Sequence, residues 1–223
     1  MKKINQYIDH TLLKPDAIQA QIQKLCEEAI EHHFYAVCVQ PYYVRFCKKL
    51  LSKSSVKVCT VIGFPLGANH PEIKKAETLQ ALADGADEID MVLNIGELKA
   101  GHDQNVLSDI QKVVNATHQG KKICKVIIET SLLNTDEKIR ACRLVSEAKA
   151  DFIKTSTGFS GGGATVADIE LFKKNVSSEV KIKASGGVKT YADAIAMIEA
   201  GASRLGTSSG IALTQGQTAS GSY

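Results

Sequence analysis

Strand-like and helix-like segments alternate along the whole chain, and this alternation restricts the fold more than any other feature. Short apolar segments occur at residues 7–13, 35–40, 56–62, 88–94, 122–129, 151–154, 180–184 and 204–206. Between them, apolar residues recur at helical spacing, as at residues 71–84, 165–175 and 190–200. Pro15 and Asp16 predict the start of the first helix. Strands that alternate with helices predict a parallel sheet with helical crossovers.

Eight strand-like segments in 223 residues favour one closed (β/α)8 barrel, and an open, doubly wound sheet is the alternative. No Gly-x-Gly-x-x-Gly motif follows the first strand, which disfavours a dinucleotide-binding open sheet. With 44% hydrophobic residues, the chain can bury a core without disulfides or metals. We therefore predict one α/β domain, a TIM barrel over residues 1–213. A short flexible tail, rich in Gly, Ser and Thr, follows at 214–223.

The charge and cysteine content disfavour several classes of protein. The net charge is +3, and the basic residues form no block that would suit nucleic acid. The chain has no run of about 18 apolar residues and no apolar stretch typical of a secretory signal. None of the six cysteines lies in a Cys-x-x-Cys pair, so we expect reduced thiols and no metal site. These features predict a cytoplasmic protein with no membrane or nucleic-acid partner.

Two lysines end neighbouring strand-like segments at the same level. Lys154 ends segment 151–154, Lys183 lies near the end of segment 180–184, and a Gly-rich loop follows each. Neighbouring parallel strands lie about 5 Å apart, so two ammonium groups would repel each other at the carboxyl ends of the strands, where barrels carry their active sites. Loss of one proton relieves this repulsion and gives an amine that can form a Schiff base with a carbonyl substrate. Two structural surface lysines are the alternative interpretation.

Two further charged residues lie within apolar segments. Asp90 lies in segment 88–94, where a buried acid is costly unless it is paired. An inward Asp90 could pair with a lysine and transfer protons, or it could form a structural ion pair that fills the barrel. Lys125 lies in segment 122–129, and we expect it beside Asp90 in a structural role, with electrostatic support of the site as a second role.

Loops rich in Gly and Ser follow the last three strand-like segments, at residues 156–163, 185–187 and 206–210. Barrels often bind phosphate at their last loops, because small residues expose backbone N–H groups and hydroxyls add further donors. Ordinary turn formation is the alternative for any one of these loops. Three such loops in succession favour a phosphate site.

Together these stretches resemble the deoxyribose-phosphate aldolase family. The most specific matches are Lys-Thr-Ser-Thr-Gly at 154–158 and Lys-Ala-Ser-Gly-Gly at 183–187. Further matching stretches occur in the family's order at 7–15, 36–41, 59–67, 85–92, 94–96, 125–130 and 204–210. The resemblance implies a class I aldolase that needs no metal or other cofactor. Such an enzyme reversibly cleaves 2-deoxy-D-ribose 5-phosphate to acetaldehyde and D-glyceraldehyde 3-phosphate, in the catabolism of deoxyribose phosphates.

The resemblance also implies roles for individual residues. Lys154 would form the Schiff base, and Lys183 would tune the protonation of that amine and, with Asp90, donate and accept protons. Tyr223, at the end of the tail, would assist proton transfer; a water, or Asp90 with Lys183, is the alternative relay. Asp9 would contact a substrate hydroxyl. The implied substrate-binding residues are Asp9, Lys125, Thr157, Gly158, Gly186, Gly187, Ser208 and Ser209. The family also makes a homodimer plausible.

Cys38 lies near the end of the second strand-like segment, so its thiol could add to an unsaturated aldehyde formed by aldol dehydration. A buried structural thiol is the alternative for Cys38. Two other functions stay open for the chain as a whole. A phosphosugar isomerase or epimerase would usually show a carboxylate or histidine base at a strand end. A non-catalytic barrel that binds phosphorylated metabolites would not need Asp90, Lys154 and Lys183 together.

Overall fold

In the computed structural model, parallel strands close into a barrel, which confirms the fold predicted from the alternation. The structure describes residues 3–217. The strands pair in chain order, and the last pairs with the first to close the barrel. They are β1 (Ile8–Leu12), β2 (Ala36–Val39), β3 (Lys57–Ile62), β4 (Glu88–Val92), β5 (Ile123–Ile127), β6 (Phe152–Lys154), β7 (Lys181–Ser185) and β8 (Arg204–Thr207).

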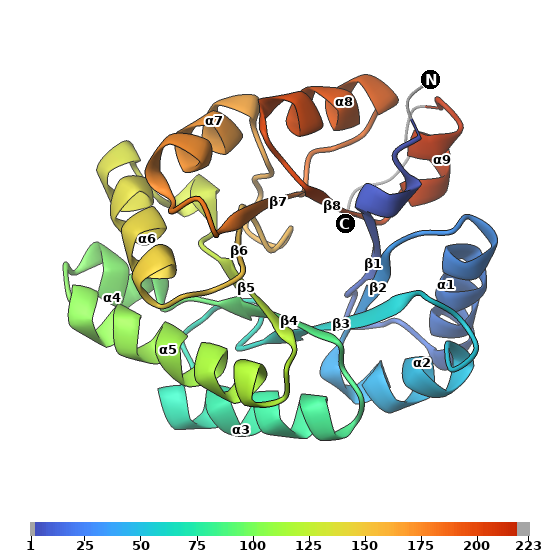
Figure 1. Cartoon of the computed structure of the whole chain (residues 1–223), viewed down its shortest axis with the longest axis horizontal. Coiled ribbons are helices and arrows are strands. Elements are labelled where there is room, and N and C mark those ends of the chain that lie inside the picture. Colours follow the sequence, from blue (N-terminus) through green and yellow to red (C-terminus); the bar gives the residue numbers. More distant parts are fainter. Residues whose placement is uncertain (1–2, 218–223) are drawn as a thin grey trace.

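Helices surround the barrel on its outer side, as Figure 1 shows. Within the described residues they are α1 (Gln19–Glu31), α2 (Val44–Leu50), α3 (Pro71–Ala83), α4 (Ile95–Lys99), α5 (Asp103–Gln119), α6 (Thr135–Glu147), α7 (Val166–Asn175), α8 (Tyr191–Ala200) and α9 (Gly210–Thr214). Polar residues start several of them, because a side-chain oxygen accepts a backbone N–H at the helix start. Asn134 caps α6 in this way, and Thr165 and Thr190 cap α7 and α8.

The first helix begins later than predicted. Pro15 and Asp16 form a turn, in which the Ala17 N–H donates to the Lys14 carbonyl at 3.1 Å. The first helical residue is Gln19. Proline fixes the backbone angle that a turn needs at its second position as well as the one that a helix start needs, so the prediction of a helix start there was wrong.

Two strands, β4 and β5, end two residues earlier than predicted, each for a local reason. The Asn94 side chain accepts the Glu97 N–H at 3.2 Å and starts the short helix α4, so β4 ends at Val92. Glu129 adopts a left-handed backbone conformation with φ of 54°, so β5 ends at Ile127. The sequence pattern predicts neither α4 nor α9, because a helix of one to two turns carries little periodicity.

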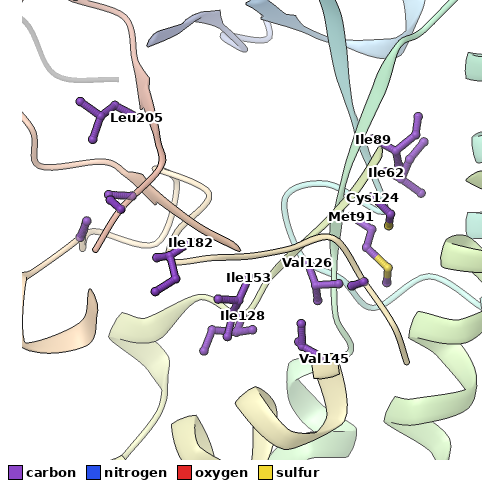
Figure 2. Close-up of a cluster of buried hydrophobic side chains, with 14 of the residues drawn as sticks. Ile62, Ile89, Met91, Cys124, Val126, Ile128, Val145, Ile153, Ile182 and Leu205 are labelled. Atoms are coloured by element: carbon purple, nitrogen blue, oxygen red, sulfur yellow. The ribbon is translucent and has the colours of Figure 1, made fainter. Parts of the chain in front are cut away.

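The strands separate a large outer core from a charged interior. In β4, Ile89 and Met91 belong to the core that packs against the helices, together with Val145 of α6 (Figure 2). The alternate residues Glu88 and Asp90 pair instead with side chains of other strands inside the barrel. The period of two along β4 therefore places the acids on the inner face, where a barrel builds its active site.

A second, smaller apolar cluster lies on the inner side of β2 and β3. It consists of Leu13, Cys38, Cys59 and Val61, with Phe64 packed against it. Cys59 belongs to both environments, since its Sγ also lies 3.1 Å from Asp90 Oδ1. The barrel interior therefore has an apolar side at β2 and β3 next to the charged side chains of β4 to β8.

Candidate active site

The two strand-end lysines meet at one carboxylate oxygen. Lys154, the last residue of β6, is aligned with Lys183 of β7 in the strand register. Their Nζ atoms lie 2.8 and 2.7 Å from Oδ2 of Asp90. The structure thus brings together the three residues that the sequence suggests for catalysis.

Asp90 lies at the centre of this arrangement and is fully buried. Its second oxygen, Oδ1, accepts a hydrogen bond from Lys125 Nζ at 2.7 Å and from Cys59 Sγ at 3.1 Å. Two neighbouring ammonium groups alone would repel each other. The carboxylate between them offsets that repulsion, because each ammonium group then has an anion as its nearest charge.

The charged cluster extends below the lysine pair toward the amino ends of the strands. Its members are Asp9, Glu88, Asp90, Lys125, Lys154, Lys183 and Arg204. Lys183 Nζ lies 2.5 Å from Asp9 Oδ2, and Lys125 Nζ lies 2.6 Å from Glu88 Oε2. Arg204 bridges Asp9 and Glu88 and stacks on the Tyr35 ring, 3.7 Å from its centroid. These contacts make one connected ion network.

The network contains more cations than anions. Four basic side chains face three carboxylates, so one positive charge is left over when all of them are ionised. Lys125 and Lys183 each contact two carboxylates, whereas Lys154 contacts only Asp90. Because Lys154 has the fewest anionic partners, it is the lysine whose neutral form costs the network least. This difference favours Lys154 as the nucleophile among the three lysines.

The pKa shifts of the other two lysines agree with this assignment. Burial opposes protonation of Lys183, but Asp9 and Asp90 outweigh burial and raise its pKa. Burial also opposes protonation of Lys125, but Asp90, Glu88 and the other negative groups around it together outweigh burial, so the pKa of Lys125 is raised as well. Both lysines are therefore held as cations at neutral pH.

The pKa shifts of the buried carboxylates predict that the fold loses stability in acid. Burial opposes ionisation of Asp90, but Lys125, Lys154 and Lys183 outweigh it and hold the pKa of Asp90 well below the usual 3.8. Burial is likewise outweighed at Asp9, mainly by Arg204, so its pKa is lowered too. A lowered folded-state pKa stabilises the fold above the unfolded-state pKa, and this contribution is lost as the pH falls through the folded-state pKa.

We therefore expect the free energy of unfolding to fall steeply below about pH 4, where the unfolded chain takes up protons at these two positions and the folded chain does not. Urea unfolding from pH 7 to pH 3 measures this dependence. Asp9→Asn should reduce the slope of the unfolding free energy against pH between pH 4 and pH 3. The reduction should correspond to about one proton fewer taken up on unfolding. An unchanged slope in that variant would show that Asp9 does not titrate differently in the two states.

Two predicted substrate-binding residues lie within the ion network. Asp9 and Lys125 have no exposed surface, and their charged atoms contact neighbouring network members. For Lys125 this placement favours the structural and electrostatic roles suggested from the sequence. Direct contact of either side chain with a substrate stays a prediction.

The loops after β6 and β7 approach each other closely at the same end of the barrel. Gly186 has a φ of 73°, and a Cβ at Gly163 would lie 2.6 Å from the Gly186 carbonyl carbon, so a larger residue at either position would not fit without strain. The Ala164 N–H donates to the Gly186 carbonyl at 3.0 Å. Gly158 and Gly187 also have positive φ values, of 87° and 75°. Of these glycines Gly187 is exposed and Gly186 is buried, so Gly187 offers its backbone most openly to the phosphate that the sequence predicts here.

The polar residues of the predicted phosphate loops differ in which hydrogen-bond donors are already used within the protein. Thr157 is buried, and its N–H and hydroxyl both donate to the Glu129 carboxylate. Ser208 is exposed after β8, and the Ser209 N–H donates to Thr207 Oγ1 at 3.0 Å. The hydroxyls of Ser208 and Ser209 therefore suit a phosphate better than the donors of Thr157 do.

Four residues of the site region were not predicted. Glu88 and Arg204 complete the ion network, Cys59 donates to Asp90, and Glu129 holds Thr157. The sequence contains a signal for Glu88 and Arg204. Glu88 shares the inner face of its strand with Asp90 by the period of two, and Arg204 is a charged residue at the start of an apolar strand. No sequence signal identified Glu129.

Cys38 lies on the inner apolar side, fully buried and close to Cys59. A hydrogen bond with Cys59 lowers the pKa of the Cys38 thiol, although burial opposes this. A lower pKa increases the thiolate fraction, and the thiolate is the nucleophile. The structure thus places the candidate thiol next to Asp90 and Cys59, which contact each other.

We expect Cys38→Ala to keep its activity longer than the parent protein in concentrated acetaldehyde, because no thiol is left there to add to the unsaturated condensation product. Residual activity after timed incubation measures this effect. Cys142→Ala is the matched control, since burial raises the pKa of that α6 thiol to about 12. Equal inactivation of the parent and Cys38→Ala would contradict the prediction.

Cys38, Cys59 and Asp90 also form a group whose ligand atoms lie within 4.8 Å of one another. Thiolates and a carboxylate are suitable ligands for a soft divalent metal. However, Lys125 and Lys154 already donate to the two oxygens of Asp90, and their positive charges would oppose a cation there. The donor set therefore suits the lysine network better than a metal.

Tyr223 and the rest of segment 218–223 lie outside the described residues. No helix in residues 3–217 is long and apolar enough to cross a membrane.

The chain is similar to known aldolases over nearly its whole length. The model of the DeoC/LacD family of aldolases matches residues 3–216. A deoxyribose-phosphate aldolase of Streptococcus suis is 57% identical over 221 residues, which is 99% of this chain and 100% of that protein. One from Brevibacillus brevis is 58% identical over 219 residues, or 98% of each chain.

A solved structure described as a tetrameric deoxyribose phosphate aldolase from Aeropyrum pernix has a TM-score of 0.89 and 30% identity, over 95% of this chain and 89% of that one. A full-length family match and relatives above half identity, together with a lysine pair on one buried carboxylate, lead to one conclusion. The chain belongs to the DeoC/LacD family of aldolases.

Proposed function

We propose that this protein is a class I aldolase that reversibly cleaves 2-deoxy-D-ribose 5-phosphate to acetaldehyde and D-glyceraldehyde 3-phosphate. The observation that carries the proposal is the contact of Lys154 and Lys183 with one oxygen of Asp90 at the carboxyl end of the barrel. The names of the relatives from Streptococcus suis and Brevibacillus brevis support the same substrate.

Catalysis starts with the neutral amine of Lys154, which attacks the aldehyde carbon of the sugar. Loss of water from the carbinolamine gives a protonated imine. This imine withdraws electrons, so the bond between C2 and C3 breaks when the C3 hydroxyl loses its proton. Glyceraldehyde 3-phosphate leaves, and the electron pair of the broken bond becomes the double bond of an enamine on Lys154. Protonation of C2 and hydrolysis then release acetaldehyde.

Asp90 and Lys183 suit the proton transfers in this sequence. Both lie within hydrogen-bond distance of each other, and Asp90 also contacts the nucleophile. A proton can pass from Lys183 Nζ through Asp90 Oδ2 toward the carbinolamine oxygen, and back during enamine protonation. We propose this pair as the relay; a water or Tyr223 is the alternative for the C2 proton.

The two sides of the barrel suit the two ends of the sugar phosphate. We propose that Gly186, Gly187, Ser208 and Ser209 bind the phosphate, with their backbone N–H groups and hydroxyls as donors. The inner apolar cluster on β2 and β3 lies beside Asp90 and would accommodate the methyl group of the two-carbon product. This division orients the substrate with its aldehyde at Lys154.

No metal or other cofactor enters this chemistry, because the imine supplies the electron withdrawal that a metal would otherwise provide. We also propose a homodimer, as the family resemblance implies, whereas the solved structure from Aeropyrum pernix is described as tetrameric. A cytoplasmic location is proposed as well, in line with the free cysteines of the described chain.

The direct test is to incubate the purified protein with 2-deoxy-D-ribose 5-phosphate and to quantify both products. Acetaldehyde and glyceraldehyde 3-phosphate in equal amounts would support the proposal. Formation of an isomeric phosphosugar without carbon–carbon cleavage would indicate the isomerase function instead. Binding of the sugar phosphate without any product would indicate a non-catalytic barrel.

A further inference from the structure

Glu129 has an unusual backbone conformation beside the strand that carries Lys154. Its φ and ψ are 54° and 68°, in the left-handed region that residues other than glycine rarely adopt. On either side of it, the Ile128 N–H donates to the Lys154 carbonyl at 3.1 Å, and the Thr130 N–H donates to the Thr155 carbonyl at 3.0 Å. The chain thus stays paired to β6 while the Glu129 side chain turns over the end of that strand.

The Glu129 carboxylate is fully buried, and its hydrogen bonds to described residues all come from the loop that follows Lys154. The Thr157 N–H lies 3.3 Å from each carboxylate oxygen, and the Thr157 hydroxyl donates to Oε2. Ser160 Oγ donates to Oε2 at 3.1 Å. Within residues 3–217, Glu129 forms no ion pair with a basic side chain. Hydrogen bonds from this loop therefore replace the solvation that the buried carboxylate has lost.

The other side of the same loop is tied to β7. The Thr155 N–H donates to the Lys183 carbonyl at 3.2 Å, and the Thr155 hydroxyl donates to the Ser185 carbonyl at 3.0 Å. Ser185 Oγ donates to the Ser156 carbonyl at 2.6 Å. The three residues after Lys154 are thus held between β7 on one side and Glu129 on the other.

The contacts continue from Thr157 to a loop on another strand. The Phe159 N–H donates to Thr157 Oγ1 at 3.0 Å. The Phe159 ring meets the Phe64 ring, in the loop after β3, edge to face at 5.2 Å between centroids. Glu129 therefore anchors a chain of contacts that joins the loops after β5, β6 and β3 near the lysine site.

We propose that Glu129 is a positioning residue that fixes the loop 155–160 and, through it, the backbone of the Schiff-base lysine. This inference rests on the proposed aldolase function. It also gives Thr157 a different role from the predicted one: its donors hold the loop on Glu129 and are not free for phosphate. Phosphate binding then falls to the loops after β7 and β8.

The test is a double-mutant cycle with Glu129→Gln and Thr157→Val. Glutamine keeps the size of the side chain but replaces one acceptor oxygen with an amide N–H₂ group, which cannot accept from the donors of the loop. Valine in place of Thr157 removes the hydroxyl donor. We expect Glu129→Gln to lower kcat for sugar phosphate cleavage about 10- to 100-fold, since small displacements of reacting groups carry penalties of this size, with KM less affected. Thr157→Val should act in the same direction, and the double variant should be no worse than about twofold below the poorer single variant.

The matched control is Asp151→Asn, because Asp151 also accepts a backbone N–H, that of Cys124 at 2.8 Å, but lies at the amino end of β6. Its kcat should stay within about twofold of the parent. A purely structural role for Glu129 would lower the unfolding temperature and leave kcat of the folded fraction unchanged. That result would overturn the proposal.

Independent effects of the two substitutions on kcat would also overturn the positioning role of Glu129. If the losses caused by Glu129→Gln and Thr157→Val multiply, Thr157 acts separately, as a substrate contact would. If Glu129→Gln does not fold, Ser160→Ala takes its place in the cycle, because it removes one donor to the same carboxylate oxygen. The rate at which borohydride traps an acetaldehyde imine on Lys154 gives a second readout. A slower rate in Glu129→Gln supports the positioning role even if the parent does not cleave the sugar phosphate, and an unchanged rate contradicts it.

Discussion

Replacement of Lys154 by alanine is expected to lower kcat/KM for sugar phosphate cleavage by about 10⁴-fold or more, equivalent to about 5 kcal/mol of transition-state stabilisation. The reason is that no other lysine of the network can take over. Lys125 and Lys183 each contact two carboxylates, and the pKa of both is raised. Steady-state kinetics with purified variant and parent measure the effect.

The same variant should keep its fold. Removal of Lys154 deletes the one positive charge that the network's carboxylates do not balance, so we expect a change in stability of no more than about 1 kcal/mol. Lys57→Ala, a change of an exposed lysine in β3, serves as the control for kinetics. Activity of Lys154→Ala within tenfold of the parent would contradict the assignment of the nucleophile.

Replacement of Asp90 by asparagine is expected to damage both activity and stability. Loss of the carboxylate removes the proton acceptor shared by Lys154 and Lys183, and acid–base groups of this kind contribute about 10²- to 10⁴-fold to rates. The change also leaves the buried ammonium group of Lys125 with Glu88 alone, and breaking a buried ion pair costs about 3–5 kcal/mol. Kinetics and urea unfolding at pH 7 measure the two effects separately.

Asp84→Asn is the matched control for Asp90→Asn. Asp84 pairs with Arg45, whose side chain is 78% exposed, and surface pairs contribute little to stability. We expect the control to match the parent in kcat. If Asp90→Asn were as stable and active as Asp84→Asn, the ion network would not have the role assigned to it.

The sequence predicts the barrel well because its evidence is local and repeated. The apolar residues of each strand predict that strand, and the period of two within β4 places Asp90 on the inner face. The equivalent positions of Lys154 and Lys183 on successive strands also follow from the sequence, because neighbouring strands of a parallel barrel share a register. Fold and nucleophile candidates therefore need no long-range information.

The rest of the site depends on contacts that cross several strands. Lys183 meets Asp9, and Arg204 meets Glu88, only because the barrel closes with a particular stagger between strands. The excess positive charge that favours Lys154 over Lys183 appears only when this network is complete. A pattern along the chain cannot show it.

Turn conformations account for further differences between the predicted and the observed structure. Pro15 suits a turn as well as a helix start, and Glu129 occupies a left-handed conformation that its residue type does not predict. The substrate-binding role of Thr157, which the family resemblance implies, stays a prediction. Its sequence context shows a Gly-rich loop but not the carboxylate that takes its donors.

The most direct measurement is borohydride reduction in the presence of acetaldehyde, followed by intact mass and peptide mapping. The account predicts the gain of one ethyl group on Lys154 and no gain in Lys154→Ala. An ethyl group on Lys183 instead would exchange the roles of the two lysines and contradict the charge argument. A folded parent protein that gains no ethyl group would contradict the Schiff-base mechanism altogether.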